Sequence, residues 1–427
     1  MSSTSYERAE FVVFFSCRLS DTPNWSQGPL PLENLPGTPY EIKANQAGRR
    51  RYVPGEQVPL ILWGTAGDPR RWHQNLDRDL SFRTARGTEV RAQISGVELL
   101  KLHDEDGLNA IAVIHGRCVS EADSLLSALV EFCNVDRVHG QQMRDAVGSL
   151  ISPASLGTSV RRGRMMSLVQ PGSNGLAEIA PNLDGKWSRE QQWLWFLATC
   201  HLPDTITVGA AQIARLKSDR LSISDDWAAF SAVEGTAYVA RKPHVVDAHV
   251  LDLLRQRAFR FHTIETDAFL LSEAQDSLIT HITSQIFNAR RRDAENPLQE
   301  MRSALSAFRL MYWGDRIAER GFTNELLASR RSVKEIPRRL QELKDDVDQV
   351  EAEVAEGSAV ATNSALGILA VIGLPLSSAL VIWQTFEPKP EGLWFVGLAT
   401  LVSAVVLVWA FPGLRSLPRQ FFRRRRR

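Results

Sequence analysis

Cysteine is scarce in this chain, and neither sign of charge dominates. The 427 residues include only four cysteines, which are scattered and form no Cys-x-x-Cys pair: Cys17, Cys118, Cys133 and Cys200. This pattern excludes a disulfide-stapled secreted scaffold and a cysteine-rich zinc module. The 50 basic and 49 acidic residues nearly cancel, so the overall charge gives no reason to expect a nucleic-acid partner.

Recognisable catalytic motifs are missing as well. The sequence has no Walker loop, no Gly-x-Gly-x-x-Gly after a strand, no Gly-x-Ser-x-Gly and no His-Glu-x-x-His. Three groups of residues come nearest to a metal or nucleophilic site: His244, Asp247 and His249; His115, Cys118 and Cys133; and Asp104, Glu105 and Asp106. We interpret them as surface, buried structural and solvated-turn residues, respectively. The sequence therefore predicts no enzyme activity, no metal site and no cofactor.

Two long stretches without charge lie near the C-terminus. Residues 357–386 and 392–414 contain no Asp, Glu, Lys or Arg, and the part from Ala365 to Trp383 is almost wholly apolar. About 20 such residues span the core of a bilayer. Because the connection 387–391 is very short, the sequence predicts an antiparallel transmembrane hairpin over residues 365–414. A buried helical hairpin in a soluble core is the less favoured alternative.

The distribution of arginine predicts the orientation of this hairpin. Arginines follow the second stretch at positions 415, 419 and 423–427, whereas the connecting loop has the single basic residue Lys389. Basic residues concentrate on the cytoplasmic side of membrane proteins, so the tail 415–427 is expected there. Two spans return the chain to the same side, which places residues 1–356 in the cytoplasm. The polar start predicts no signal peptide, and the expected location is the inner (plasma) membrane.

A heptad pattern precedes the first uncharged stretch. Apolar residues alternate at spacings of three and four, as in a coiled-coil seam; the seam includes Leu340, Leu343, Val347, Val350 and Val354. Pro337 predicts that the helix starts or kinks there. Together with helices expected over 246–292 and 298–330, the pattern predicts a helical region and stalk over residues 246–364. The seam pairs either with another helix of the chain or with copies of itself.

Residues 1–245 are predicted to form a cytoplasmic α/β domain. We expect strands at 11–15, 91–102, 110–116 and 221–224, a hairpin of 227–233 with 236–240, and helices at 121–132 and 187–201. The proline-rich stretch 20–58 predicts a long irregular loop. The predicted fold class is therefore an α/β cytoplasmic domain followed by a long α-helical stalk and a C-terminal two-helix transmembrane hairpin.

This layout resembles that of the CorA-like divalent-cation transporters. The likeness is closest over Thr362-Asn-Ser-Ala-Leu-Gly-Ile-Leu-Ala-Val-Ile-Gly-Leu-Pro375-Leu, which is similar to the family's Thr-Asn start and intramembrane Pro-Leu, and in the arginine tail. It covers residues 350–427 at most. The family's Gly-Met-Asn signature is replaced by Val381-Ile-Trp-Gln-Thr-Phe386, which argues against magnesium selectivity. The resemblance implies a funnel-shaped pentamer whose first span lines a pore.

One face of the first stretch is small and polar. Its candidate pore-lining residues are Asn363, Gly367, Ala370, Ser377 and Gln384, of which all but the glycine recur every seven positions. Such a face suits a water-lined path, and it suits close helix packing equally well. The outer mouth is expected at Thr385, Glu387 and Glu391, where the acids either attract cations or are simple solvated loop charges.

A weaker resemblance is to membrane effectors of prokaryotic conflict systems, some actinobacterial examples of which accompany caspase-like proteases. It implies that the spans permeabilise the membrane after a trigger and that Arg161, Arg162 and Arg164 belong to a cleavable loop, although a flexible linker explains these residues equally well. The expected partners are the lipid bilayer, further copies of the chain, and a cytoplasmic protein or protease. Three functions follow: a CorA-like channel or pore protein, an antiviral defence effector, or a non-conducting membrane-anchored scaffold.

Overall fold

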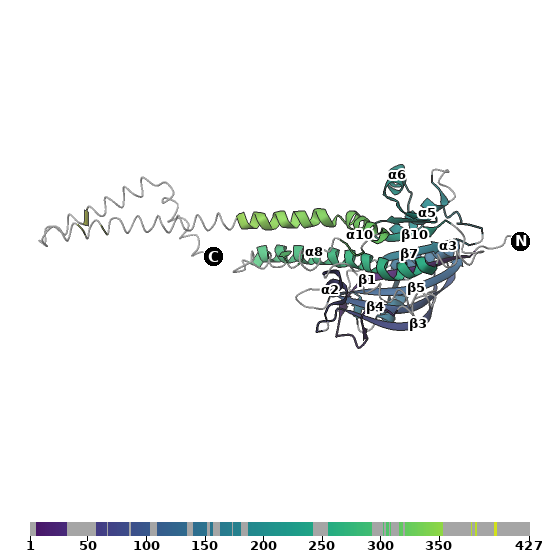
Figure 1. Ribbon diagram of the computed structural model, residues 1–427, viewed down its shortest axis with the longest axis horizontal. Helices are drawn as coiled ribbons and strands as arrows, with labels where there is room; N and C mark the ends of the chain where they lie inside the picture. The colour runs from purple at the N-terminus through teal and green to yellow at the C-terminus, as the bar shows by residue number, and fades with distance from the viewer. Residues whose placement is uncertain are drawn as a thin grey trace. The chain divides into compact units, whose positions relative to one another are not determined.

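A mixed β-sheet with helices on both faces forms the centre of the computed structural model (Figure 1). The structure describes residues 6–31, 57–65, 67–84, 87–102, 109–134, 140–151, 154–156, 163–172, 174–180, 187–241, 255–292, 302, 305, 306, 308, 316–318, 321–352, 377, 381, 397 and 398. The chain divides into two compact units, Met1–Leu343 and Lys344–Arg427. The sheet and the helices packed on it belong to the first unit.

Ten strands of the described residues make up this sheet. They are β1 (Tyr6–Leu19), β2 (Ser26–Gln27), β3 (Arg71–Arg83), β4 (Glu89–Lys101), β5 (Asn109–Glu121), β6 (Ala154–Leu156), β7 (Arg164–Gln170), β8 (Leu221–Ser224), β9 (Trp227–Ser231) and β10 (Gly235–Ala240). The order is β2-β3-β4-β5-β1-β7-β10-β9-β8, and β6 pairs with the end of β1. The pair β7–β10 is parallel and the other pairs are antiparallel.

The central strand β1 is buried on both faces, which explains its unbroken run of Phe and Val. Successive side chains of a strand point to opposite faces of the sheet. Phe11, Val13 and Phe15 accordingly join the main hydrophobic core. Phe14 points the other way and stacks on Phe269, with ring centroids 4.4 Å apart.

Helices cover both faces of the sheet. They are α2 (Gln57–Trp63), α3 (Ala122–Cys133), α4 (Gly140–Leu150), α5 (Arg189–Thr199), α6 (Ala210–Asp219), η2 (Phe261–Glu265), α8 (Thr266–Arg292) and α10 (Phe322–Val333). The main core includes buried residues of α3 and α5 against one face. On the opposite face lie η2 and α8, with α10 packed beside α8. This second face carries the polar features described below.

A short turn separates α10 from the helix that follows it. Helix α10 follows Gly321, whose φ of 97° favours glycine, and ends at Val333. Residues 336–352 are helical again, so Pro337 lies in a first turn, where its missing N–H costs nothing. Glu335 between them has a φ of 53°. Among the residues that are described, Ile336, Leu343, Val347 and Val350 are buried, while Leu340 is half-buried.

These elements confirm the predicted α/β class. The expected strands correspond to β1, β4, β5 and β8, the expected hairpin to β9 and β10, and the expected helices to α3 and α5. Strands β3 and β7 were not predicted. In the region expected to be helical over 298–330, residues 302, 305, 306 and 308 of the described part are helical, and α10 follows Gly321.

The predicted membrane hairpin lies outside the described residues, except for 377, 381, 397 and 398. Each of these four is helical and exposed. Within the described part of the chain, no helix combines the length and the apolar character that a membrane crossing needs.

Candidate functional site

The face of the sheet beneath η2 and α8 carries a cluster of buried charges. Alternation along β1, β4 and β5 turns Glu10, Glu98 and His115 toward the two helices, and Arg71 of β3 lies beside them. From the helices come His262 and Asp267. We call these six residues, together with Arg8, the buried charge cluster. Six of its seven members are 1% exposed or less, so every charge in it requires a partner within the protein.

Arg71 bridges the sheet and α8. Its Nε donates to Oε2 of Glu98 at 2.9 Å, and its Nη1 donates to Oδ1 of Asp267 at 2.7 Å. Burial alone would lower the pKa of the Arg71 guanidinium, but the charges and hydrogen bonds of Asp267 and Glu98 outweigh it and raise that pKa. The second carboxylate oxygen of Glu98 accepts the backbone N–H of Leu30 at 2.6 Å. Arg71 therefore stays charged and ties α8 to the sheet.

Two histidines face each other in the same cluster. Nδ1 of His115 lies 3.2 Å from Nδ1 of His262. The other ring nitrogen of each points to a carboxylate: Nε2 of His262 lies 3.4 Å from Oε2 of Glu10, and Nε2 of His115 lies 3.7 Å from Oε1 of Glu98. The geometry is thus a carboxylate, two imidazoles and a second carboxylate in one row.

Glu10 closes this row at the other end. Its Oε1 accepts two hydrogen bonds from Arg8, from Nε at 3.1 Å and Nη2 at 2.6 Å. Burial alone would raise the pKa of Glu10, but the hydrogen bond and charge of His262, together with Arg8, outweigh it and lower that pKa. Glu10 is therefore ionised at neutral pH and presents a negative charge to His262.

The π-helical turn η2 supplies His262 to the cluster. The hydroxyl of Thr266 donates to the carbonyl of Phe261 at 2.7 Å, and that of Thr263 donates to the carbonyl of Phe259 at 2.7 Å. Such turns are rare in helices and occur frequently at functional sites. The widened turn also buries Glu265, whose Oε2 accepts from Nη2 of Arg257 at 2.6 Å. Burial raises the pKa of Glu265, and Arg257 offsets only part of this effect.

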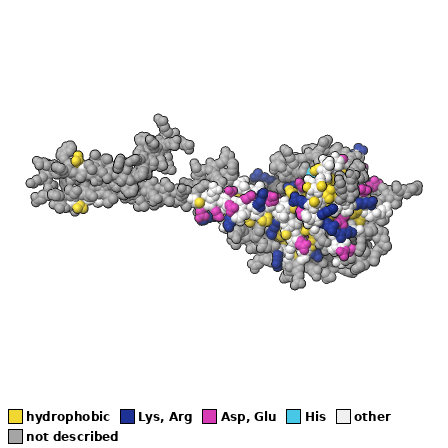
Figure 2. Space-filling view, turned by 90° about the horizontal axis from the view of Figure 1, so that it is seen from above, with side chains coloured by type: hydrophobic (Ala, Val, Ile, Leu, Met, Phe, Trp, Pro, Cys, Tyr) yellow, Lys and Arg dark blue, Asp and Glu magenta, His cyan; other side chains and the backbone are white. Residues whose placement is uncertain are grey.

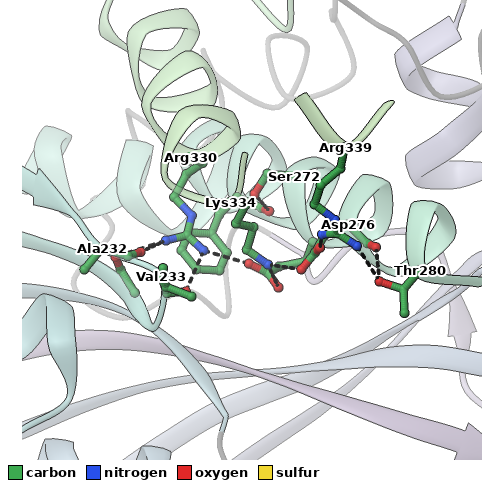
Figure 3. A network of polar contacts seen from close by, with 11 residues as sticks. Ala232, Val233, Ser272, Asp276, Thr280, Arg330, Lys334 and Arg339 are labelled. Atoms are coloured by element: carbon green, nitrogen blue, oxygen red, sulfur yellow. Dashed lines mark hydrogen bonds and ion pairs between the residues drawn. The ribbon is translucent and has the colours of Figure 1, made fainter. Parts of the chain in front are cut away.

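A second polar group, farther along α8, holds α10 and the helix that follows it. We call Glu273, Asp276, Arg330, Lys334 and Arg339 the α8 clamp. Figure 3 shows Arg330, Lys334 and Arg339 reaching from one side toward carboxylates of α8. Lys334 donates from Nζ to Oε2 of Glu273 at 2.6 Å and to Oδ2 of Asp276 at 2.7 Å. Arg339 pairs with Asp276 and also donates to the Thr280 hydroxyl at 2.9 Å.

Arg330 anchors the clamp to the sheet. Its guanidinium lies over the ring of Phe269 at 4.1 Å from the centroid and donates to Oε1 of Glu273 at 2.8 Å. It also donates to the carbonyls of Ala232 and Gly235 in the β9–β10 turn. One buried side chain thus joins α10, α8 and the sheet.

The carboxylates of the clamp are ionised. Burial alone would raise the pKa of Glu273 and of Asp276, but the charge of Lys334 and the neighbouring arginines outweigh it, so both pKa values are lowered. A network of several partly buried charges is worth more than isolated surface pairs. The clamp therefore holds the start of helix 336–352 firmly against α8.

Comparison with known proteins assigns the chain to no family. No family model, curated protein or solved structure matches the chain.

Only some of the site candidates predicted from the sequence lie within the described residues. Arg164 is the first residue of β7 and pairs with Phe14 of β1, whereas Arg161 and Arg162 lie outside the described residues. The same holds for the groups at 104–106 and 244–249, and for every pore and mouth candidate except Ser377, which is helical and exposed. Cys118 and Cys133 are buried with the other two cysteines.

Four members of the buried charge cluster are not among the candidates predicted from the sequence: Glu10, Arg71, Glu98 and His262. A signal for three of the cluster residues is present: Glu10, Glu98 and His115 interrupt apolar runs of strands, where a charged or polar residue needs a buried partner. Within the described residues, no group of three or more His, Cys, Asp or Glu side chains is arranged to hold a metal ion. On the face seen in Figure 2, basic and acidic side chains are interspersed over the described surface.

Proposed function

We propose that this chain is a two-span membrane protein that assembles as an oligomer and passes ions along its first span. The observation that carries the proposal is the pair of charge-free stretches, 357–386 and 392–414, followed by an arginine tail. Each is long enough to cross a bilayer. The tail favours an inner-membrane location with both termini in the cytoplasm.

Two described side chains of this region support the proposal. Val381 and Leu398 are helical, and their side chains are 62% and 64% exposed. Large aliphatic side chains exposed on a helix favour contact with lipid or with further copies of the chain. In the first stretch Ser377 and Gln384 belong to the small, polar face, which suits a water-lined path in a symmetric assembly.

The α8 clamp gives the N-terminal unit a means of acting on the helix that leads toward the spans in the sequence. Arg339 of that helix is paired to Asp276 of α8, and α8 is in turn tied to the sheet through Arg71 and Asp267. A rigid connection of this kind passes a rearrangement of the sheet or of α8 on to the helix that contains Arg339. The α/β domain accordingly acts as the cytoplasmic control domain.

A second candidate is a defence effector whose hairpin permeabilises the membrane after activation. The observation that favours it is the sequence Val381-Ile-Trp-Gln-Thr-Phe386, which stands where CorA-like proteins carry their selectivity signature. A pore without that signature discriminates poorly among ions, which suits a toxic effector activated by a caspase-like protease or another cytoplasmic partner.

Ion flux through liposomes tests the proposal. The full chain is reconstituted with an entrapped fluorescent ion indicator, and the double variant Ser377→Leu/Gln384→Leu is compared with the original chain. Leucine at both positions makes the polar face apolar, so we expect flux to be lost. The matched control is Ala365→Leu/Ala379→Leu, which enlarges two small residues on the opposite side of a helix with 3.6 residues per turn and should conduct normally.

The remaining outcomes separate the candidates. Absence of flux from the original chain, or a monomeric mass in detergent, contradicts both pore functions and favours a non-conducting membrane-anchored scaffold. Growth arrest when the original chain, but not the double leucine variant, is expressed favours the effector over a selective channel.

A further inference from the structure

A buried carboxyl group on the opposite face of the sheet lacks a hydrogen-bond partner within the described part of the chain. Glu7 of β1 is 0% exposed, and neither of its carboxyl oxygens is hydrogen-bonded. Alternation along β1 turns Glu7 to the same face as Ala9 and Phe11, which belong to the main core with α3 and α5. An ionised carboxylate in such a place is costly until a cation or hydrogen-bond donors meet it.

Two further acids lie near this carboxyl group, at the start of α3. Glu121 is the N-cap residue of that helix and makes no capping hydrogen bond through its side chain, and Asp123 lies in the first turn. Both are exposed. Burial raises the pKa of Glu7, the charges of Asp123 and Glu121 add to this effect, and the backbone N–H groups of Glu7 and Ala177 offset part of it. The start of α3 therefore concentrates negative charge around a buried acid.

The loop that follows β7 borders the same carboxyl group and is fixed to α5. The backbone N–H of Ala177 lies near Glu7, while the carbonyl of Ala177 accepts from Nε1 of Trp193 at 2.9 Å. Farther along the loop, the backbone N–H of Ala180 donates to Oε1 of Gln192 at 3.1 Å. The fold thus holds Glu7 beside both the first turn of α3 and an anchored loop.

The chemistry of these groups selects an organic cation as their ligand. A ligand that offsets the buried charge of Glu7 must be positive and must donate hydrogen bonds to its two oxygens. Within the described residues, no group of three or more His, Cys, Asp or Glu side chains is arranged to hold a metal ion. A primary ammonium group supplies one positive charge and three N–H donors in a compact head. It can therefore bind Glu7 and still face one of the exposed acids.

We propose that Glu7, Glu121 and Asp123 form a binding site for a primary ammonium group. The two exposed acids attract the cation, which enters between the first turn of α3 and the neighbouring loop and binds Glu7. Bound ligand supplies the counter-charge that Glu7 lacks in the free protein, and locally unfavourable groups of this kind are expected at functional sites. The ammonium group comes from a free aliphatic diamine or from a lysine side chain of another protein. The inference concerns the N-terminal unit and does not depend on the proposed membrane function.

Isothermal titration calorimetry of the full chain with putrescine, an aliphatic diamine, tests the site. We expect saturable one-to-one binding at low ionic strength. Tetramethylammonium carries the same type of charge without an N–H group, so it should not bind. Lysine with both backbone ends blocked distinguishes the two sources, because it should bind more tightly than putrescine if the natural ligand is a protein side chain and more weakly if it is a free diamine. Binding of neither amine, or equal binding of tetramethylammonium, overturns the proposal.

A matched pair of variants makes the test specific. Glu7→Gln keeps the shape of the side chain but removes its charge, so we expect putrescine affinity to fall about tenfold or more, as for the loss of a charge-assisted hydrogen bond. Glu89→Gln removes the same charge from the exposed start of β4 and should leave the affinity unchanged. Unchanged affinity in Glu7→Gln, or an equal fall in Glu89→Gln, contradicts the site.

Ionic strength separates the buried contact from attraction at the surface. The double variant Glu121→Gln/Asp123→Asn should bind putrescine more weakly at low salt, and this difference should shrink in about 1 M sodium chloride, where the screening length is about 3 Å. The difference between Glu7→Gln and the original chain should persist there, because a buried group is screened much less. If it disappears, amines only gather around the acidic start of α3, and the site is refuted.

Discussion

Arg71 of β3 and Asp267 of α8 are in contact through a hydrogen bond of 2.7 Å, although 196 residues separate them in the chain. Both side chains are buried. A buried guanidinium and a buried carboxylate must meet with good geometry to offset their lost hydration. The contact therefore fixes where α8 begins on the sheet, and it brings His262, one turn earlier, over His115.

Replacing Arg71 with methionine should cost about 3–5 kcal/mol of unfolding free energy, because Glu98 and Asp267 are then left buried without their counter-charge. Urea unfolding followed by tryptophan fluorescence measures this loss. The control is Arg78→Met on the exposed part of the same strand, with an expected change within about 0.5 kcal/mol. Equal losses in the two variants would show that the buried bridge contributes nothing specific.

Arg330→Lys should weaken the α8 clamp even though the charge is kept. Lysine cannot reach Glu273 and the carbonyls of Ala232 and Gly235 at once, so we expect a loss of about 1.5–3 kcal/mol in urea unfolding. Arg338→Lys is the control because Arg338 is 65% exposed, and surface pairs contribute about 0–1 kcal/mol. Limited proteolysis should also cut near α10 faster in Arg330→Lys. Stability equal to that of the control would argue against the clamp.

Glu7→Gln should stabilise the protein at neutral pH. Both Oε atoms of Glu7 are buried and lack a hydrogen-bond partner among the described residues. Burial raises the pKa of this carboxyl, Asp123 and Glu121 add to the effect, and nearby backbone amides offset only part of it. A carboxyl with a raised folded pKa costs stability once the pH rises above the unfolded value of 4.5, and this cost is absent below it.

The expected gain of Glu7→Gln is therefore about 1 kcal/mol at pH 7 and fades as the pH falls through 4.5. Thermal unfolding at several pH values measures it. Glu89→Gln, at the exposed start of β4, should change stability little throughout. A gain that persists at low pH would mean that charge burial is not its cause.

Periodicity was sufficient to predict the strands and helices whose residues are nearly all buried. The Phe and Val run of β1 and the Trp-rich α5 stand out because burial on every side requires an unbroken apolar sequence. Strand β3 was missed because it is polar and exposed over much of its length and has an irregularity between Asn75 and Arg78, which breaks the alternation. Strand β7 was missed because its start coincides with a run rich in Arg and Gly.

The candidate site could be predicted only in part. The sequence places His115 in an apolar strand but does not name its partner. His262 lies 147 residues away, and the pairing of such distant positions depends on the order of strands in the sheet and on the path of α8. No local pattern encodes that order.

The sequence by itself determined the α/β class of the N-terminal part. It also predicts a charge-free hairpin near the C-terminus. Both conclusions follow from hydrophobic patterns within single elements. Only the tertiary structure decided which buried charges meet. Arg71, Glu98 and Asp267 come from three separate elements, and His115 and His262 from two more. A charge is stable in the interior only beside its partner, so the fold as a whole, and not any one segment, created the cluster.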